Sequence, residues 1–192
     1  MSILTVKYKG SSVLNREAKK INAITKDIVK LAEDMLETMY TYHGVGLAAP
    51  QVGVSKQMIV VDCGDEYQKE PYVLMNPIII DSKGYQEGDE GCLSLPGLYL
   101  PVKRFDYVAV EAVDIYGKKV VIEGRKLLSR CLQHEIDHLH GRLFDELVED
   151  KEKLQEELPK LKQRIEAILR GEISPYPVIE KEEKEELVNS SK

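Results

Sequence analysis

The chain has 192 residues, which favours one domain large enough to bury a core. Its formal net charge of -6 argues against a protein that binds DNA through its overall electrostatic field. The chain contains no run of about 18 apolar residues and no signal-peptide core near its start, so neither a membrane partner nor export is expected. Its 3 cysteines show no CxxC spacing, which argues against a disulfide framework and favours a reducing cytoplasm.

The first part of the chain predicts a strand, a helix and two further strands. Residues 3–8 read as a short strand. A helix is expected to begin at a cap provided by Asn22 or Thr25, and its apolar residues recur at helical spacing, which is typical of core scaffold. Residues 57–62 and 72–80 are rich in β-branched side chains and are expected to be strands.

Between this helix and the next strand lies a stretch of small residues, GVGLAAPQ at residues 44–51. So little side-chain bulk lets the backbone approach a ligand or another segment closely. A tight helix-to-strand connection explains the same composition, and it is the favoured interpretation of this stretch taken alone. Gln51 is the one residue here whose side chain can both donate and accept hydrogen bonds.

Residues 127–140 contain no Gly or Pro, and their apolar side chains recur at helical spacing. His134 and His138 lie four residues apart in this predicted helix, so both imidazoles can bind one transition metal ion. Glu135 is rotated from His134 by about 100°. It could reach a water activated by the metal without being a ligand, which is the position of a general base. A solvated histidine pair without a metal is the alternative.

Two histidines leave a metal site incomplete, so a third ligand must come from elsewhere in the chain. Cys92 is the strongest candidate, because it lies in a rigid segment bounded by Gly and Pro and its thiolate completes a Cys-His-His site with an open fourth position. A buried structural thiol is the alternative interpretation of this cysteine. His140 lies on the wrong side of the predicted helix, His43 lies at a helix end, and Cys131 is better placed as a pocket wall.

The remaining chain predicts a hairpin, a C-terminal helical segment and a tail. Residues 107–114 and 118–122 are expected to pair as strands through a Gly-containing turn. Residues 147–169 are helical in pattern, and Pro159 leaves open whether they form one kinked helix or two. The acidic run at residues 180–186 predicts a solvated, disordered tail.

Three motifs occur in the order GVGLAAPQ at residues 44–51, EGCLS at residues 90–94 and HEIDHLHG at residues 134–141. Together they resemble the signature motifs of the bacterial-type peptide deformylases, GφGxAAxQ, EGCφS and HExxHxxG, where φ is apolar. The resemblance implies an α+β fold with antiparallel β-sheets around a central HExxH helix, followed by a C-terminal helix. It implies a catalytic domain over residues 1–170, with residues 171–192 outside it as an acidic tail.

The resemblance also implies an activity: a metal-dependent hydrolase that removes the N-terminal formyl group from formyl-methionyl nascent polypeptides and releases formate. By motif position, the implied metal ligands are Cys92, His134 and His138. Glu135 is the implied acid and base, and Gln51 and the backbone N–H of Leu93 are the implied donors to the oxyanion. The implied substrate-binding residues are Gly44, Val45, Gly46, Glu90, Gly91, Leu127 and Cys131.

One divalent metal ion per chain is implied, Fe(II) in the cell, although the ligand set would also accept Zn, Ni or Co. The implied partners are N-formylmethionyl peptides of nascent chains, and no membrane or DNA partner is expected. The basic residues within 159–170 leave open two interpretations, a ribosome contact through the C-terminal helix and a solvated helix face.

Two positions depart from the family pattern. Tyr99 stands where many members carry an arginine near the substrate backbone. Arg130 stands where some members have an aliphatic residue in the methionine pocket, and it could contact Glu90 or leave the pocket for solvent.

Two other classes of protein share part of the pattern. A zincin-type peptidase cuts internal peptide bonds with an HExxH helix, but it normally takes a third His or Glu ligand rather than a Cys. A non-catalytic zinc module would close its fourth position with another protein ligand, for which Cys131 is the one candidate.

Overall fold

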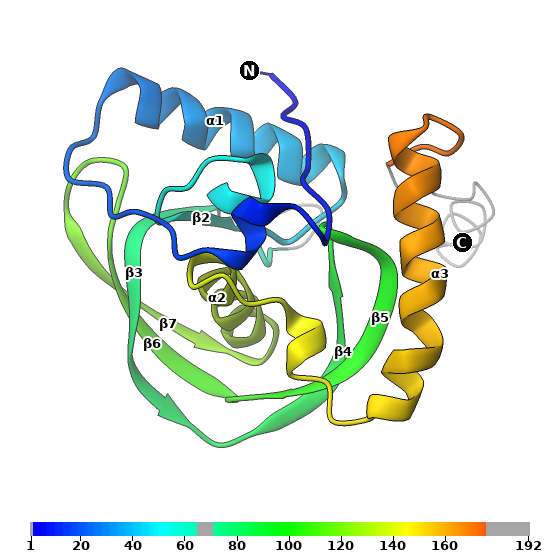
Figure 1. The fold of residues 1–192 in the computed structure, drawn as a ribbon. Helices are drawn as coiled ribbons and strands as arrows, with labels where there is room; N and C mark the ends of the chain where they lie inside the picture. The colour runs from blue at the N-terminus through cyan, green and yellow to red at the C-terminus, as the bar shows by residue number, and fades with distance from the viewer. Residues whose placement is uncertain (1, 65–70, 176–192) are drawn as a thin grey trace, which may run out of the picture.

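The computed structural model describes residues 2–64 and 71–175, whose arrangement Figure 1 shows. The fold is α+β: antiparallel sheets surround a central helix, α2 (Lys126–Leu139), and two further helices, α1 (Lys26–Thr41) and α3 (Lys151–Leu169), lie outside them. The predicted fold class is therefore confirmed. In this part of the chain, none of the helices has both the length and the apolar character needed to cross a membrane.

The larger sheet has five antiparallel strands in the order β1-β2-β3-β6-β7. Their bounds are β1 Gly46–Ala48, β2 Met58–Val61, β3 Tyr72–Lys83, β6 Tyr107–Val113 and β7 Lys119–Arg125. Ile59, Leu74 and Val110 pack in one core cluster with Leu132 and Ile136 of α2. The β-branched runs thus form the strands that the sequence predicts, and their apolar side chains cover the metal-binding helix.

The second sheet is a hairpin of β4 (Gln86–Cys92) and β5 (Leu95–Arg104). Sequence patterns predict neither strand, because β4 is rich in Gly and acidic residues and β5 contains two prolines, all of which are depleted in strands. Gly91 pairs with Tyr99 and Cys92 with Leu95, so a bulge lies between Gly91 and Cys92. A bulge can redirect the side chain beside it, and Cys92 lies at this one.

The prediction of a strand at residues 3–8 is wrong. This segment belongs to no sheet, and the backbone of Lys7 and Lys9 is bonded instead to residues of two of the motifs. The Lys7 N–H donates to the Gln51 carbonyl at 2.7 Å, and the Lys9 N–H donates to the Ser94 carbonyl at 2.9 Å.

Of the two expected caps, Thr25 begins α1, and its hydroxyl accepts a hydrogen bond from the Ile28 N–H. The buried face of α1 includes Met35 and Met39, which pack with Met58 of β2. α1 is therefore core scaffold, as the sequence predicts.

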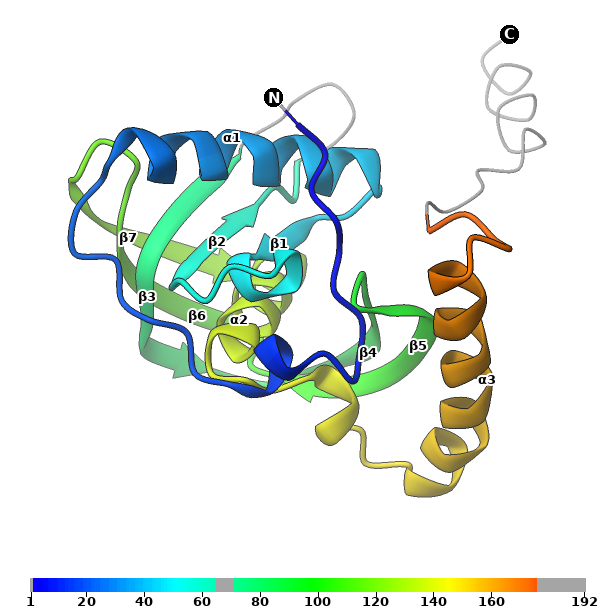
Figure 2. The ribbon, with the colours of Figure 1, turned by 45° about the horizontal axis from the view of Figure 1, so that its top comes forward.

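α3 is one continuous helix that includes Pro159, so the alternative of two helices is wrong. Its buried residues Leu154, Leu161 and Ile165 pack in a cluster with Leu98 of β5. Figures 1 and 2 both show α3 standing beside β5, apart from the larger sheet. The tail predicted at residues 180–186 lies outside the described residues.

Candidate metal centre and active site

The two histidines of the HExxH motif meet on the buried face of α2. The His134 and His138 rings lie edge to face, with centroids 4.9 Å apart and an interplanar angle of 84°. Both side chains are buried, so the alternative of a solvated histidine pair is wrong. The four-residue spacing thus brings the imidazoles together as the helical prediction requires.

Cys92 reaches these histidines from the end of β4. Its Sγ lies 3.3 Å from the Nε2 of His138. One ligand atom each from Cys92, His134 and His138 lies within 4.8 Å of the others, and residues 2–64 and 71–175 contain no other such group of His, Cys, Asp or Glu. One sulfur and two imidazole nitrogens are donors that divalent transition metal ions accept, so this donor set fits a metal site.

The ring nitrogens of the two histidines are placed so that one nitrogen of each can bind an ion. The His134 Nδ1 lies 2.9 Å from Glu90 Oε2, which leaves Nε2 for an ion. The His138 Nε2 faces the Cys92 sulfur, while its Nδ1 is buried and has no hydrogen-bond partner among the described residues. Cys131 is not a fourth ligand, because its Sγ donates to the carbonyl of Val45 at 3.3 Å. Cys131 therefore does not close a fourth ligand position, as a non-catalytic zinc module would require.

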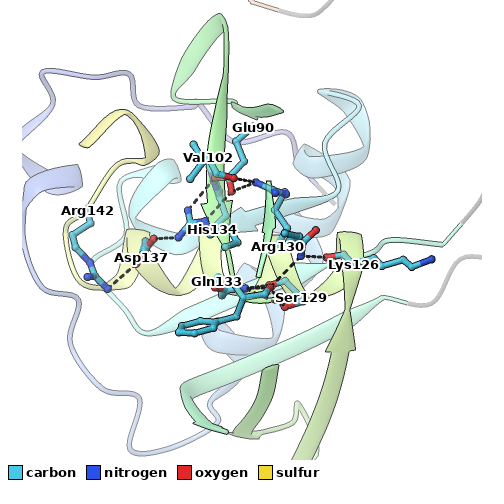
Figure 3. A network of polar contacts seen from close by, with 12 residues as sticks. Glu90, Val102, Lys126, Ser129, Arg130, Gln133, His134, Asp137 and Arg142 are labelled. Carbon is cyan, nitrogen blue, oxygen red and sulfur yellow. Dashed lines mark hydrogen bonds and ion pairs between the residues drawn. The ribbon is translucent and has the colours of Figure 1, made fainter. Parts of the chain in front are cut away.

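Glu90 lies at the centre of a buried charge network, which Figure 3 shows. Arg104 donates to its two carboxylate oxygens at 2.8 and 3.0 Å, and Arg130 donates to it at 2.8 Å. Burial raises the pKa of Glu90, but hydrogen bonds with His134 and Arg104 outweigh burial and lower that pKa to about 2. Glu90 is therefore an ionised group that orients the His134 ring.

The sequence left two directions open for Arg130, and its side chain turns toward Glu90 rather than to solvent. Three members of the network, Arg104, Asp137 and Arg142, were not identified from the sequence. Arg104 also contacts Asp137 at 2.5 Å, and Asp137 in turn contacts Arg142 at 2.7 Å. The position of Asp137 within the HExxH helix is a signal that could have identified it, whereas no local pattern marks Arg104.

Gln51 lies in a short 3-10 helix, η2 (Ala49–Val52), and its side chain is buried beside the metal ligands. Its Oε1 accepts a hydrogen bond from the Ala48 N–H at 2.8 Å, which fixes the orientation of the amide. Its Nε2 lies 3.4 Å from the Cys92 Sγ and 3.2 Å from the Ser94 Oγ. The small-residue stretch thus holds one hydrogen-bond donor at the centre rather than serving as a simple connection.

Glu135 is 3% exposed, and its Oε2 has no hydrogen-bond partner among the described residues. Burial raises the pKa of Glu135 to about 7. β1 passes so close that a Cβ on Gly46 would collide with the Glu135 carboxylate and the Cys131 sulfur. A carboxyl group with a pKa near neutrality can both accept and release a proton.

A cavity of about 740 Å³ opens onto these groups, which is within the usual size of a small-ligand site. Except for buried His138, every residue that the sequence assigns to the site lines it: Gly44, Val45, Gly46, Gln51, Glu90, Gly91, Cys92, Leu93, Leu127, Cys131, His134 and Glu135. Tyr99 and Arg130 line it as well. Unexpectedly, so do residues of α3 and residues 173–175.

The sequence is similar to one well-defined group of proteins. The family model described as Polypeptide deformylase matches residues 3–154. A peptide deformylase of Desulfitobacterium hafniense is 51% identical over 144 residues, which cover 75% of this chain and 93% of that protein. Peptide deformylase 1 of Bacillus anthracis is 49% identical over 144 residues, which cover 75% of this chain and 91% of that protein.

Solved structures resemble the fold over a similar range. The crystal structure of peptide deformylase from Ehrlichia chaffeensis matches with a TM-score of 0.81 at 34% identity, covering 88% of this chain and 99% of that one. The structure of a peptide deformylase from Synechococcus elongatus in complex with actinonin matches with a TM-score of 0.79 at 43% identity, covering 82% of this chain and 86% of that one.

Proposed function

The chain belongs to the peptide deformylase family, and from its site we propose the part that each residue plays in the reaction. The protein is a metal-dependent hydrolase that removes N-formyl groups. One observation carries the residue assignments: the ligand atoms of Cys92, His134 and His138 converge beside a cavity that Gln51 and Glu135 also line.

Cys92, His134 and His138 would hold one divalent ion. When bound, such an ion supplies Lewis-acid chemistry, polarising a carbonyl oxygen and lowering the pKa of a water toward about 7. Fe(II) is the proposed ion in the cell, on the family resemblance, although the donor set suits Zn, Ni and Co as well. Metal analysis of protein isolated without oxygen tests the identity, and zinc as the main ion under those conditions would exclude iron.

Glu135 is the proposed general base and general acid. Its carboxylate accepts a proton from the attacking water and returns that proton to the amine nitrogen as the bond between the formyl carbon and this nitrogen breaks. Its burial and its pKa of about 7 support the role, because a group poised near the working pH can act in both directions.

Gln51 and the backbone N–H of Leu93 are the proposed donors to the negative charge that develops on the formyl oxygen when water adds to the formyl carbon. The Gln51 carbonyl oxygen is occupied by the Ala48 N–H, so the NH₂ group is the part of the amide that faces the centre. A donor fixed before the reaction stabilises developing negative charge without reorganising.

The extended peptide is proposed to run between β1 and β4. Both are edge strands of their sheets in the described structure, and edge strands can pair with an added chain. Gly44, Val45, Gly46 and Gly91 line the cavity, and free backbone groups of these residues would make these hydrogen bonds. The proposed wall of the methionine pocket consists of Val45, Glu90, Leu127 and Cys131.

Formate release from formyl-Met-Ala-Ser tests the activity directly, and a peptide blocked at both ends tests the peptidase alternative. We expect formate from the first peptide and no internal cleavage of the second. A zincin-type peptidase would give the opposite pair of results.

Beyond the peptide itself, the ribosome is the proposed partner and the cytoplasm the proposed compartment, since nascent chains are the substrate. Lys160 and Lys162 are exposed on α3, although Lys160 pairs with Glu157 at 2.7 Å. Salt-sensitive binding to ribosomes that falls when both lysines are replaced by Glu would support docking through α3. Ribosome binding that is unchanged by the double replacement would exclude docking through α3.

A further inference from the structure

One wall of the cavity comes from residues that lie beyond the end of the family-model match. The family-model match ends at residue 154, within the first turn of α3. Nevertheless, Arg164 and Ile168 of α3, together with residues 173–175, line the cavity that holds Cys92 and Glu135. This wall can therefore give the chain a substrate preference that the shared motifs do not encode.

The packing of α3 holds Arg164 at this wall. Leu161 and Ile165, on either side of it in the helix, are buried in one cluster with Leu98 of β5. Gly97, which precedes Leu98, has a φ of +73°, and a Cβ there would collide with the Arg164 guanidinium. The glycine thus provides the space in which the guanidinium lies, against β5 and next to the cavity.

The charge of Arg164 is not neutralised within the described residues. The side chain is exposed, and no carboxylate of residues 2–64 or 71–175 forms an ion pair with it. Two other cations of α3 differ in this respect: Lys160 pairs with Glu157 and Arg170 pairs with Glu172. A guanidinium presents a planar set of donors that matches a carboxylate.

We propose that Arg164 is a specificity-determining residue that binds an acidic side chain of the peptide downstream of its formyl-methionine. The inference rests on the proposed course of the peptide through this cavity. The enzyme would favour chains that carry Asp or Glu at one early position over chains that carry Lys there. The expected preference is about two- to fivefold in kcat/KM, because the ion pair forms at an exposed rim.

Three series of formylated tetrapeptides test this proposal. Starting from formyl-Met-Ala-Ala-Ser, Glu, Gln or Lys is placed in turn at the second, third and fourth residue, and kcat and KM are measured by formate release. At one position we expect Glu to exceed Gln and Lys for the wild-type enzyme. Arg164→Glu should invert this order at the same position and should change KM more than kcat, whereas Arg164→Lys should keep the order.

Lys162→Glu is the matched control, since it makes the same charge change on the same helix at an exposed residue outside the cavity lining. It should leave the Glu-to-Lys ratio as in the wild type. An equal change for Lys162→Glu, or an unchanged ratio for Arg164→Glu at all three positions, would overturn the assignment of Arg164. Failure of the wild-type enzyme to release formate from any of these peptides would instead refute the proposed function.

Discussion

The hydrogen bond that the Gln51 Oε1 accepts decides which end of the Gln51 amide faces the metal site. Because the Ala48 N–H donates to the Gln51 Oε1, the Gln51 Nε2 is directed at the sulfur of Cys92. We expect Gln51→Ala to lower kcat by about 100- to 1000-fold with unchanged metal content, since that is the usual cost of one oxyanion donor. Ser94→Ala removes a neighbour of the amide without removing the donor, and it should cost much less. A Gln51→Ala enzyme within tenfold of the wild type would contradict the role.

The buried Glu90 carboxylate is expected to make the free energy of unfolding depend on pH in the acidic range. Its folded pKa of about 2 lies below its ordinary value of 4.5, so its contribution to folding is fully present above about pH 4.5 and is lost as the pH falls toward 2. We expect the free energy of unfolding to fall by about 3 kcal/mol through this group over that range. Urea unfolding of the metal-free protein, compared with Glu90→Gln, measures the difference.

Glu87→Gln is the control for Glu90, since it removes the same charge from an exposed position of the same strand. The acid-dependent loss should persist in Glu87→Gln and flatten in Glu90→Gln. If both variants lose stability equally between pH 4.5 and 2, the buried network is not the source of the acid-dependent loss of stability.

At the scale of secondary-structure elements, β1 passes close to α2 beside Glu135, the proposed general base. A Cβ on Gly46 would collide with the Glu135 carboxylate, so Gly46→Ala must displace this side chain or the strand. We expect kcat to fall by roughly 100-fold, the scale of loss that a displacement of about 1 Å can cause. Circular dichroism should show that the fold is retained.

Gly88→Ala is the control for Gly46, because a Cβ there would meet its nearest neighbour, Arg130, at an ordinary contact distance of 3.5 Å. Its kcat should stay near that of the wild type. A Gly46→Ala enzyme with wild-type kcat would show that the strand can yield without disturbing Glu135.

At the scale of the whole molecule, the metal site joins α2 to the end of β4. Removing the ion with a chelator should abolish formate release and lower Tm by about 10 °C, the shift expected for loss of a ligand present at about 1,000 times its Kd. Differential scanning fluorimetry measures Tm, and returning a divalent ion should restore both properties.

Cys92→Ser should resemble the chelated protein and no longer respond to the chelator. Cys63→Ser, at a free cysteine outside the metal group, should retain the response. If chelation changes neither Tm nor activity, these residues hold no functional ion.

Much of the fold follows from local patterns, because short-range periodicity decides which segments become helices and which become strands. The helical spacing across residues 127–140 was enough to predict α2 and to place His134 beside His138. The β-branched runs predicted four strands of the larger sheet for the same reason. The acidic, Gly-rich β4 and the proline-containing β5 were not predicted as strands. Their residues have a low intrinsic preference for strands, and pairing of the two segments with each other overrides it.

By itself, the sequence therefore determined the metal-binding helix, the candidate ligands and, through three motifs, the family. Only the tertiary structure decided which distant groups meet. Arg104 joins Glu90 and Asp137 in one buried network, and α3 brings Arg164 to the substrate cavity. Such contacts depend on how helices and sheets pack, and the residues that make them carry no local periodicity to reveal them.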